Sequence, residues 1–252
     1  MNRKTQVRDK THFLERVSRE MDEDLGVLDL SPAEALAAAC RILGREGHES
    51  GLAGQVTAPG EKPGTWWTLK FGLGFEEATA ERMVLVDEDL KPLGGGRANP
   101  GVRFHVWIYK KRPDVKAIIH THAPFASALA ATGTPLKTIH MDSAMLHGTA
   151  HLPEWPGVPV ADDEGRIISG ALGSAKTILL SNHGLLAAGA SIEEATYLAV
   201  FFERAARMQI RAMAAGGFKE VKPELAAEAR DFLLQPPIVR GTFAYWARRC
   251  QT

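Results

Sequence analysis

The stretch Ile118-Ile119-His120-Thr121-His122-Ala123-Pro124 decides the fold that we expect for this chain. The run from Val115 to Ile119 is rich in β-branched side chains and predicts a short buried strand. Side chains at positions i and i+2 of a strand point to the same face. We therefore expect His120 and His122 to project side by side where this strand ends.

A third histidine lies in the tripeptide Asn182-His183-Gly184, about sixty residues further along. It follows the apolar run 176–181 and precedes a second apolar run, 185–189, so we expect it in a turn between two strands. Three neutral imidazoles leave a tetrahedral divalent ion one open position, which is typical of catalytic metal sites. A His-x-His pair alone is weaker support, because histidines also lie with satisfied hydrogen bonds in protein cores.

The segments IIHTHAPFASALA (118–130) and ILLSNHGLLAAGASIEEA (178–195) resemble the metal-binding segments of the class II aldolase/adducin family. This resemblance extends from about residue 31 to about residue 216. It implies that His120, His122 and His183 bind a divalent metal ion, zinc before manganese, cobalt or iron. It also implies a central sheet that is largely antiparallel and a homotetramer.

The composition narrows the class of protein. The chain has 252 residues, of which 45% are hydrophobic and 24% charged, and its thirty basic residues balance thirty acidic ones. A chain without excess positive charge is not expected to bind nucleic acid. The N-terminus lacks an apolar segment, so we expect a cytoplasmic protein that does not bind membranes. Cys40 and Cys250 show no metal-ligand spacing, and a disulfide is not expected in that compartment.

The chain divides into three predicted parts: a charged N-terminal arm (1–30), a class II aldolase/adducin-like domain (31–222), and a C-terminal helix with an aromatic tail (223–252). Capping-box patterns at Ser31–Glu34 and Ser191–Glu194 predict the starts of two helices. The second helix is expected to reach about residue 215 and, at about 35 Å, to cover a whole sheet.

Shorter elements fill the space between these helices. Apolar runs separated by turn residues predict several strands between Gly51 and Leu90. One helix is expected to start at Asn99-Pro100 and to stop before Arg112-Pro113, and another covers 124–131. Residues 136–146 are expected as a strand or a loop. Strands with helices on both sides make an α/β protein with three layers, α/β/α.

The chain departs from the sugar-phosphate aldolases of the family at their acid/base glutamate. An alignment on Arg103-Phe104-His105 and Arg112-Pro113-Asp114 places that glutamate at Gly101. The phosphate loop is matched only in part: 54–57 (Gly-Gln-Val-Thr) fits the family's Gly-Asn-x-Ser loop, whereas 70–75 replaces the expected threonine-glycine pair. We therefore expect a substrate without a phosphate group.

Aromatic residues on neighbouring elements favour an apolar or aromatic carboxylate as the substrate. They are Trp66, Trp67, Phe71, Phe75 and Trp107.

Several residues are candidates for the remaining roles in the site. His147 or Asp142 could move the proton, because imidazole titrates near neutrality and carboxylates can be tuned to do so. A hydrogen bond that orients a metal ligand is the alternative role for both. Gln55 and Arg103 are the candidate substrate-binding residues, although a surface salt bridge is the alternative for Arg103. Tyr245 is a further catalytic candidate.

We expect a metal-dependent lyase, an aldolase or decarboxylase, that breaks a carbon–carbon bond of a carbonyl or aromatic carboxylate substrate through a metal-stabilised enolate. Two alternatives stay open: an Fe(II)-dependent oxygenase of the same fold, and a non-catalytic binding protein of the adducin type. The aromatic C-terminus, with Phe243, Tyr245 and Trp246, is expected at a subunit boundary of the tetramer.

Overall fold

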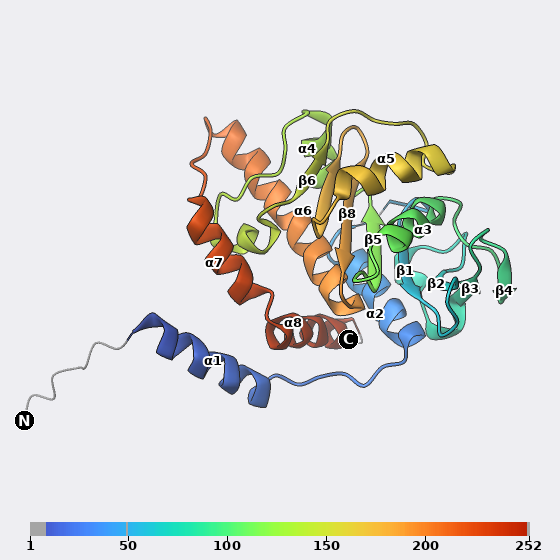
Figure 1. The fold of residues 1–252 in the computed structure, drawn as a ribbon, viewed down its shortest axis with the longest axis horizontal. Coiled ribbons are helices and arrows are strands. Elements are labelled where there is room, and N and C mark those ends of the chain that lie inside the picture. The colour runs from blue at the N-terminus through green and yellow to red at the C-terminus, as the bar shows by residue number, and fades with distance from the viewer. Residues whose placement is uncertain (1–8, 49, 251–252) are drawn as a thin grey trace, which may run out of the picture.

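A computed structural model describes residues 9–48 and 50–250. Within that part the strands form a single eight-stranded sheet with helices on both faces (Figure 1). The strands are β1 (Gln55–Pro59), β2 (Trp66–Leu69), β3 (Met83–Val86), β4 (Pro92–Gly94), β5 (Ala117–Thr121), β6 (Ala150–Leu152), β7 (Thr177–Leu180) and β8 (Gly184–Gly189). The helices are α1 (Lys10–Asp24), α2 (Pro32–Arg45), α3 (Val102–Lys111), α4 (Pro124–Ala131), α5 (Asp162–Leu172), α6 (Ile192–Ala214), α7 (Pro223–Leu233) and α8 (Pro236–Arg249), with 3-10 turns η1 (Phe75–Glu77), η2 (Ala80–Arg82) and η3 (Met141–Leu146).

The strand order is β4-β3-β2-β1-β5-β8-β7-β6, and only the β6–β7 pair is parallel. The predicted α/β class with a largely antiparallel sheet is thereby confirmed. The histidine strand β5 is central, with Gln55 of β1 opposite His120 on one side and Leu186 of β8 opposite it on the other. It starts two residues later than predicted, because the backbone N–H of Val115 bonds to the carbonyl of Arg112 in the turn after α3.

Successive side chains of β5 point to opposite faces of the sheet and pack in two different hydrophobic cores. Ile119 belongs to the larger cluster, which the sheet forms with α2, α4, α6 and α8. Ile118 belongs to a smaller cluster, which the sheet forms with α3 and α5. Because side chains two positions apart share a face, His120 lies on the Ile118 side, toward α3. The edge-on packing of the Phe104 ring from α3 on His120, with centroids 5.2 Å apart, agrees with this placement.

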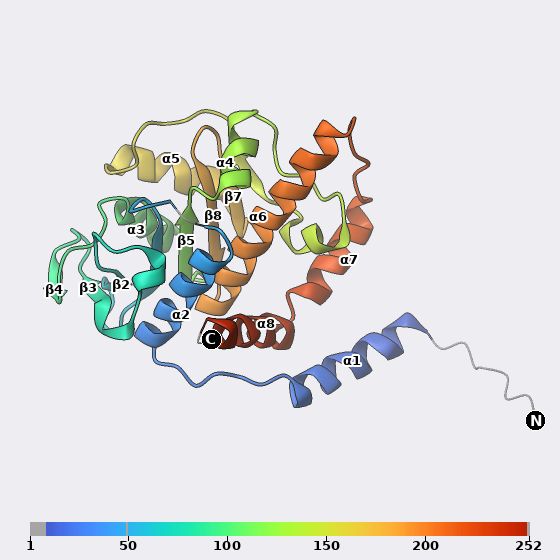
Figure 2. The same ribbon diagram turned by 180° about the vertical axis from the view of Figure 1, so that it is seen from behind.

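The helices form the two outer layers of the domain (Figures 1 and 2). α3 and α5 pack together on one face, whereas α2, α4 and α6 cover the other, with α8 outside α2 and α6. α6 has 23 residues, and at about 1.5 Å per residue it spans about 35 Å. The α/β/α layering expected from the sequence is therefore present.

Both predicted capping boxes start a helix. At α2 the Ser31 hydroxyl accepts from the backbone of Glu34, and the Glu34 carboxylate accepts from the backbone of Ser31 at 2.8 Å. At α6 the Ser191 hydroxyl accepts from the backbone of Glu194 at 3.2 Å. The Glu194 carboxylate does not bind the backbone N–H of Ser191, as a capping box requires. It accepts hydrogen bonds from Lys176 and from the backbone N–H of Ala190, the residue before Ser191.

The described residues nearest the two ends of the chain form helices. Residues 1–8 of the predicted arm lie outside the described part, but the helix α1 follows and is held to the body by a hydrogen bond of 2.8 Å from Ser18 to Gln235. The predicted aromatic tail is the helix α8, which Pro236 and its neighbour start at the first helical positions. The division into an arm, a domain and a C-terminal part stays a prediction.

The expectation that the C-terminal aromatics are available to a partner subunit is wrong for two of the three. Phe243 and Trp246 are buried within their own chain, and Trp246 packs against Tyr197 and Phe201 of α6. Because α8 is a helix, its apolar face can reach the core that α2 and α6 already form. Tyr245 is on the other side and is 50% exposed.

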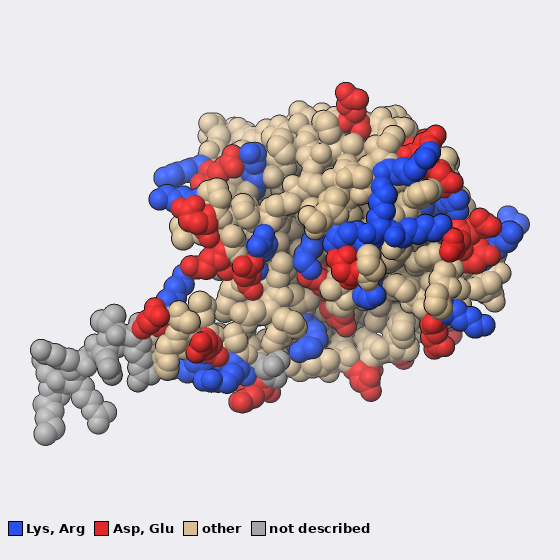
Figure 3. Space-filling model, in the orientation of Figure 1, with Lys and Arg blue, Asp and Glu red and all other residues tan. Residues whose placement is uncertain are grey.

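Segment 136–146 contains the turn η3 and no strand, and β6 and α5 were not predicted. On the face shown in Figure 3, basic and acidic side chains lie interspersed, as the balanced composition predicts. Within the described ranges, a helix both long and apolar enough to cross a membrane is not found.

Candidate metal centre

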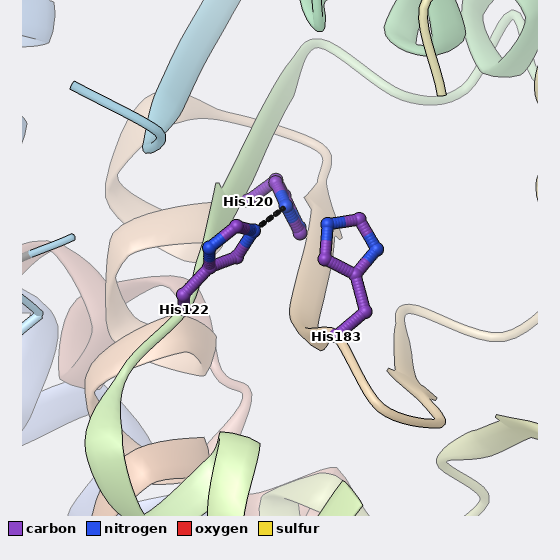
Figure 4. A group of neighbouring side chains, drawn as sticks. All are labelled: His120, His122 and His183. Carbon is purple, nitrogen blue, oxygen red and sulfur yellow. Dashed lines mark hydrogen bonds between the residues drawn. The ribbon is translucent and has the colours of Figure 1, made fainter. Parts of the chain in front are cut away.

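Three histidines converge at one end of the sheet (Figure 4). His120 is the fourth residue of β5 and is 1% exposed, and His122 follows just after the strand ends. His183 lies in the turn between β7 and β8. Thr121, which lies between the first two histidines, points to the opposite face, and its hydroxyl contacts the buried His48 ring at 2.9 Å. The strand and turn predicted from the sequence therefore place all three imidazoles together.

The imidazoles are spaced as ligands of one ion. The ring centroids lie 5.0 Å apart for His120 and His122, 4.6 Å for His120 and His183, and 4.7 Å for His122 and His183. The Nε2 atoms of His120 and His122 are 3.1 Å apart. Two nitrogens bound at about 2.0–2.1 Å to a tetrahedral ion would be separated by about 3.3 Å. One ligand nitrogen from each of the three rings lies within 4.8 Å of the other two.

A tight turn holds the third histidine in place. Asn182 has a φ of 54°, a left-handed conformation that asparagine tolerates better than most residues. Gly184, which follows His183, lies so close to β5 that a Cβ added there would be 2.4 Å from the carbonyl oxygen of Thr121. The backbone carbonyl of His183 accepts a hydrogen bond of 3.0 Å from Ser127 of α4. The Asn-His-Gly tripeptide is therefore fitted to the end of β5.

The hydrogen bonds of His120 determine which nitrogen is free for a metal. Its Nδ1 lies 2.8 Å from the carbonyl oxygen of Leu185, and because a carbonyl can only accept, Nδ1 carries the proton. The Nε2 atom then presents its lone pair toward His122 and His183. This orientation by a backbone carbonyl is typical of histidines that bind metals.

Electrostatics keep the three rings neutral. Burial lowers the pKa of His120 well below its ordinary value, and His183, His122 and His105 nearby lower it further. Burial, with His122 beside it, lowers the pKa of His183 to about 4. Burial also lowers the pKa of His122. At neutral pH the imidazoles are therefore unprotonated, as metal ligands must be.

The donor set fits a divalent metal ion. Three neutral imidazole nitrogens suit zinc, copper, iron or nickel better than magnesium or calcium, which prefer oxygen ligands. Two buried polar atoms on the same side of the sheet, Oε1 of Gln55 and Nε2 of His105, have no hydrogen-bond partner in the described part of the chain. A water or ligand group beside these two atoms would satisfy them.

The candidate substrate-binding residues have different surroundings. Gln55 lies directly opposite His120 on β1 and is 6% exposed, so the structure brings it to the metal centre. Arg103 is bound to Asp162 of α5 through Nε and Nη2, both at 2.8 Å, and its Nη1 binds the backbone carbonyl of Glu88. The guanidinium is thus occupied by an ion pair, the alternative that the sequence left open.

The structure does not bring the candidate proton-moving groups to the histidines of their own chain. His147 lines a cavity of about 490 Å³ with Lys176 and Thr177 at the start of β7, whereas His183 follows the other end of that strand. Asp142 is exposed on η3. The local sequence could not reveal this arrangement. Because β6 runs parallel to β7, the residues before β6, including His147, lie at the end of these strands that is opposite to His183.

Tyr245 is also not joined to the three histidines by a hydrogen bond or ring contact within residues 9–48 and 50–250. The guanidinium carbon Cζ of Arg249 lies 5.6 Å from the centroid of the Tyr245 ring. A role in the site of a neighbouring subunit stays a prediction.

The aromatic residues expected to line the substrate pocket do not gather there. Trp66 is buried and stacks on Tyr109 at 6.0 Å, and the indole N–H of Trp107 binds Asp162. Phe75 packs against Gly54, and Phe71 is 47% exposed. An aromatic substrate is therefore not favoured by these side chains.

Two supporting residues were missed from the sequence. The Glu203 carboxylate of α6 accepts hydrogen bonds of 2.8 Å from the backbone N–H groups of Phe125 and Ala126. These groups lie in the first turn of α4, so Glu203 holds in place the start of the helix that follows His122. Its signal in the sequence was an acidic residue on the buried face of a long helix. His151, whose Nε2 is 3.0 Å from the Ser181 hydroxyl, supports the other ligand segment and gave no such signal.

Comparisons with known proteins agree with this geometry. Residues 34–210 match the family model of the class II aldolase and adducin N-terminal domain. A 5-methylthioribulose-1-phosphate/5-deoxyribulose-1-phosphate aldolase from Escherichia coli is 29% identical over 81% of this chain and 93% of its own. A 4-hydroxy-3-prenylphenylpyruvate oxygenase/4-hydroxy-3-prenylbenzoate synthase from Streptomyces roseochromogenus is 30% identical over 75% and 71%.

Solved structures lead to the same family. An L-fuculose 1-phosphate aldolase from Glaciozyma antarctica has 30% identity and a TM-score of 0.77, covering 87% of this chain and 88% of its own. The match spans the strands and helices that hold the three histidines, because the family model runs from α2 almost to the end of α6. The chain belongs to the class II aldolase and adducin family.

Proposed function

We propose that this protein is a divalent-metal-dependent lyase that breaks a carbon–carbon bond next to a carbonyl group in a substrate without phosphate. The observation that supports this most strongly is the convergence of three neutral imidazoles, His120, His122 and His183, without a fourth protein ligand beside them in the described residues. The relative with an aldolase name supports the same reaction class.

A divalent ion held by these rings would act as a Lewis acid on a substrate oxygen and stabilise the negative charge that develops when the bond breaks. The chain supplies the rest. His120 is locked by Leu185, and Gln55 presents a neutral amide beside it. Gly101, at the position of the glutamate of the sugar-phosphate aldolases, offers no carboxylate. The group that moves the proton is therefore not a glutamate at the family's position.

The departure of segment 70–75 from the threonine-glycine pair of the family's phosphate loop supports a substrate without phosphate. The two segments that would form the family's phosphate loop, 54–57 and 70–75, meet around Gly54, Lys70 and Gly72. The cavity between them has a volume of only about 10 Å³, about that of one water molecule.

Metal content and product release test this proposal. Purified protein loaded with Zn²⁺, Mn²⁺, Co²⁺ or Fe²⁺ is assayed anaerobically with 2-oxo acids, hydroxy acids, aromatic acids and sugar phosphates, and CO₂ or aldehyde release is measured. We expect one ion per chain and turnover only with the compounds that lack phosphate. His120→Ala should lose both metal and activity, whereas His147→Ala should keep its metal because it lies at the other edge of the sheet. A metal-free protein, or turnover limited to sugar phosphates, would contradict the proposal.

The name of the Streptomyces relative favours one second candidate, an Fe(II)-dependent oxygenase. Three imidazoles with open positions also suit non-haem iron. Activity that requires Fe(II) and consumes O₂ in proportion to product would replace the lyase by this oxygenase. A protein that binds no metal at all would instead be assigned the non-catalytic, adducin-like role.

A further inference from the structure

The helix α4 connects the two segments that carry the candidate metal ligands. It begins two residues after His122. The hydroxyl of Ser127 donates a hydrogen bond of 3.0 Å to the backbone carbonyl of His183. The backbone N–H of Asn182 donates to the carbonyl of Ala130, near the other end of the helix, at 3.3 Å. A displacement of α4 would therefore move the turn around His183 relative to the end of β5.

This helix cannot cap its own N-terminus. The residue before its first turn is Ala123, whose side chain has no hydrogen-bonding group, and its first position is Pro124, which has no N–H. The next two backbone N–H groups, of Phe125 and Ala126, each donate a hydrogen bond of 2.8 Å to a different oxygen of the Glu203 carboxylate. Glu203 on α6 therefore supplies the cap that the local sequence of α4 lacks.

The carboxylate of Glu203 has a fixed position. The residue is 7% exposed, and both of its oxygens are bonded. Burial raises the pKa of Glu203, whereas the two backbone hydrogen bonds and the nearby Arg207 lower it. The guanidinium of Arg207 lies 6.0 Å from the ring centroid of Phe125, in the same first turn of α4. A negative group is also stabilised by the partial positive charge of a helix N-terminus. Glu203 thereby fixes where α4 begins.

We propose that Glu203 is a positioning residue of the metal centre, which through α4 sets the separation of His122 from His183 and hence the affinity for the metal ion. This inference rests on the metal centre of the proposed function. The contacts run from the carboxylate to the first turn of α4, then along the backbone to His122 and through Ser127 to His183. In the described part of the chain Glu203 is not among the side chains that converge as ligands, so it acts on the ion through the helix.

Co²⁺ binding to Glu203→Gln tests this role. Glutamine has almost the same shape but offers one acceptor oxygen in place of two and carries no charge, so one of the two N–H groups loses its partner. The EDTA-treated protein is titrated with Co²⁺ against a competing chelator, well below the midpoint of thermal unfolding. We expect the dissociation constant to rise about tenfold and the visible absorption bands of the bound ion to shift, because the ligand geometry changes.

The matched control is Glu194→Gln on the same helix. Glu194 is 8% exposed, and its carboxylate accepts hydrogen bonds of 2.6 Å from the backbone N–H of Ala190 and from Lys176. These contacts lie where β8 ends, whereas His183 precedes the start of that strand. We expect this variant to unfold at a lower temperature, as loss of a buried contact predicts, but to bind Co²⁺ with the affinity and spectrum of the wild type.

A double-mutant cycle with Ser127→Ala tests the route through α4. This change removes the hydrogen bond to the His183 carbonyl and should by itself raise the Co²⁺ dissociation constant about three- to tenfold. If Glu203 acts through the same helix, the double variant with Glu203→Gln should bind Co²⁺ more tightly than the product of the two single effects predicts. Independent effects would show that the two residues do not share this route, and the inference would fail.

The remaining outcomes separate this inference from the proposed function. A wild-type affinity and spectrum in Glu203→Gln, or an equal weakening in Glu194→Gln, would overturn the inference and leave the proposed lyase intact. Failure of the wild type to bind Co²⁺ would overturn both. If Glu203→Gln does not fold, Glu203→Asp takes its place with the same expectation, because it keeps the charge but shortens the side chain by one methylene group.

Discussion

Gly184→Ala is the substitution that tests most sharply how the turn between β7 and β8 builds the metal centre. The added methyl carbon would lie 2.4 Å from the carbonyl oxygen of Thr121 and 3.2 Å from the Cα of His122. Both are backbone atoms of β5 and its end, and they cannot rotate away as a side chain could. The two ligand segments must therefore move apart.

The expected magnitude follows from overpacking in a buried site. Inserting a methyl group into a closely packed region costs about 1–3 kcal/mol. For a chain of this length that corresponds to a fall of about 2–12 °C in the midpoint of thermal unfolding. Because the same shift separates His183 from His122, we also expect the dissociation constant for Zn²⁺ to rise about tenfold or more.

The matched control is Gly170→Ala, on the exposed side of α5, where an added Cβ would have no atom within 4 Å. Alanine is favoured over glycine in a helix by about 0.5–1 kcal/mol, so this variant should unfold at a slightly higher temperature and bind Zn²⁺ normally. The assays are circular dichroism during heating, with and without EDTA, and competition for Zn²⁺ with a chromogenic chelator. A Gly184→Ala protein as stable as the wild type, with the same Zn²⁺ affinity, would refute this account of the turn.

Three further predictions follow from other parts of the structure. Burial lowers the pKa of His48 and of His105 to about 3 from an ordinary 6.5. Between these pH values the unfolded chain binds more protons than the folded chain, so the free energy of unfolding should fall as the pH falls. Urea midpoints that stay constant from pH 7 to pH 4.5 would contradict this prediction. Gly101→Glu should not create release of dihydroxyacetone phosphate from sugar phosphates, because Gln55 fills the space that the new carboxylate needs, and a large rise in that product would show that the pocket was misread. Tyr245→Ala should weaken a homotetramer and lower turnover while metal content stays the same, whereas light scattering that shows a fully active wild-type monomer at nanomolar concentration would exclude the tetramer.

Local patterns in the sequence were sufficient to predict that the candidate metal ligands lie at strand ends and turns, and to predict most of the sheet. His120 and His122 share a face because they are two residues apart in a strand, and the tripeptide around His183 is a turn because glycine and asparagine permit tight backbone conformations. Ser31 and Ser191 start their helices through hydrogen bonds within four residues. Each of these features depends on neighbours in the chain, so the sequence displays it directly.

Features that depend on distant contacts could not be predicted in this way. His147 was a candidate catalytic group because of its chemistry. The parallel pairing of β6 with β7 places it near the start of β7, away from the three histidines of its own chain. Phe243 and Trp246 looked exposed in a short tail, yet the surface of α2 and α6 that buries them is far away in the sequence. The pairing of Gln55 with Gly101 also requires the three-dimensional arrangement of β1 and α3.

X-ray absorption spectroscopy of the Zn²⁺-loaded protein is the most direct test of the central claim, that three imidazoles hold a metal ion with an open position. We predict one zinc per chain, with three imidazole nitrogens at about 2.0–2.1 Å and the remaining coordination supplied by oxygen from water or buffer. In His183→Ala, the number of imidazole ligands should fall to two and the metal should be largely lost. A zinc ion that keeps three imidazole ligands in that variant, or a wild-type protein without stoichiometric zinc, would contradict the account.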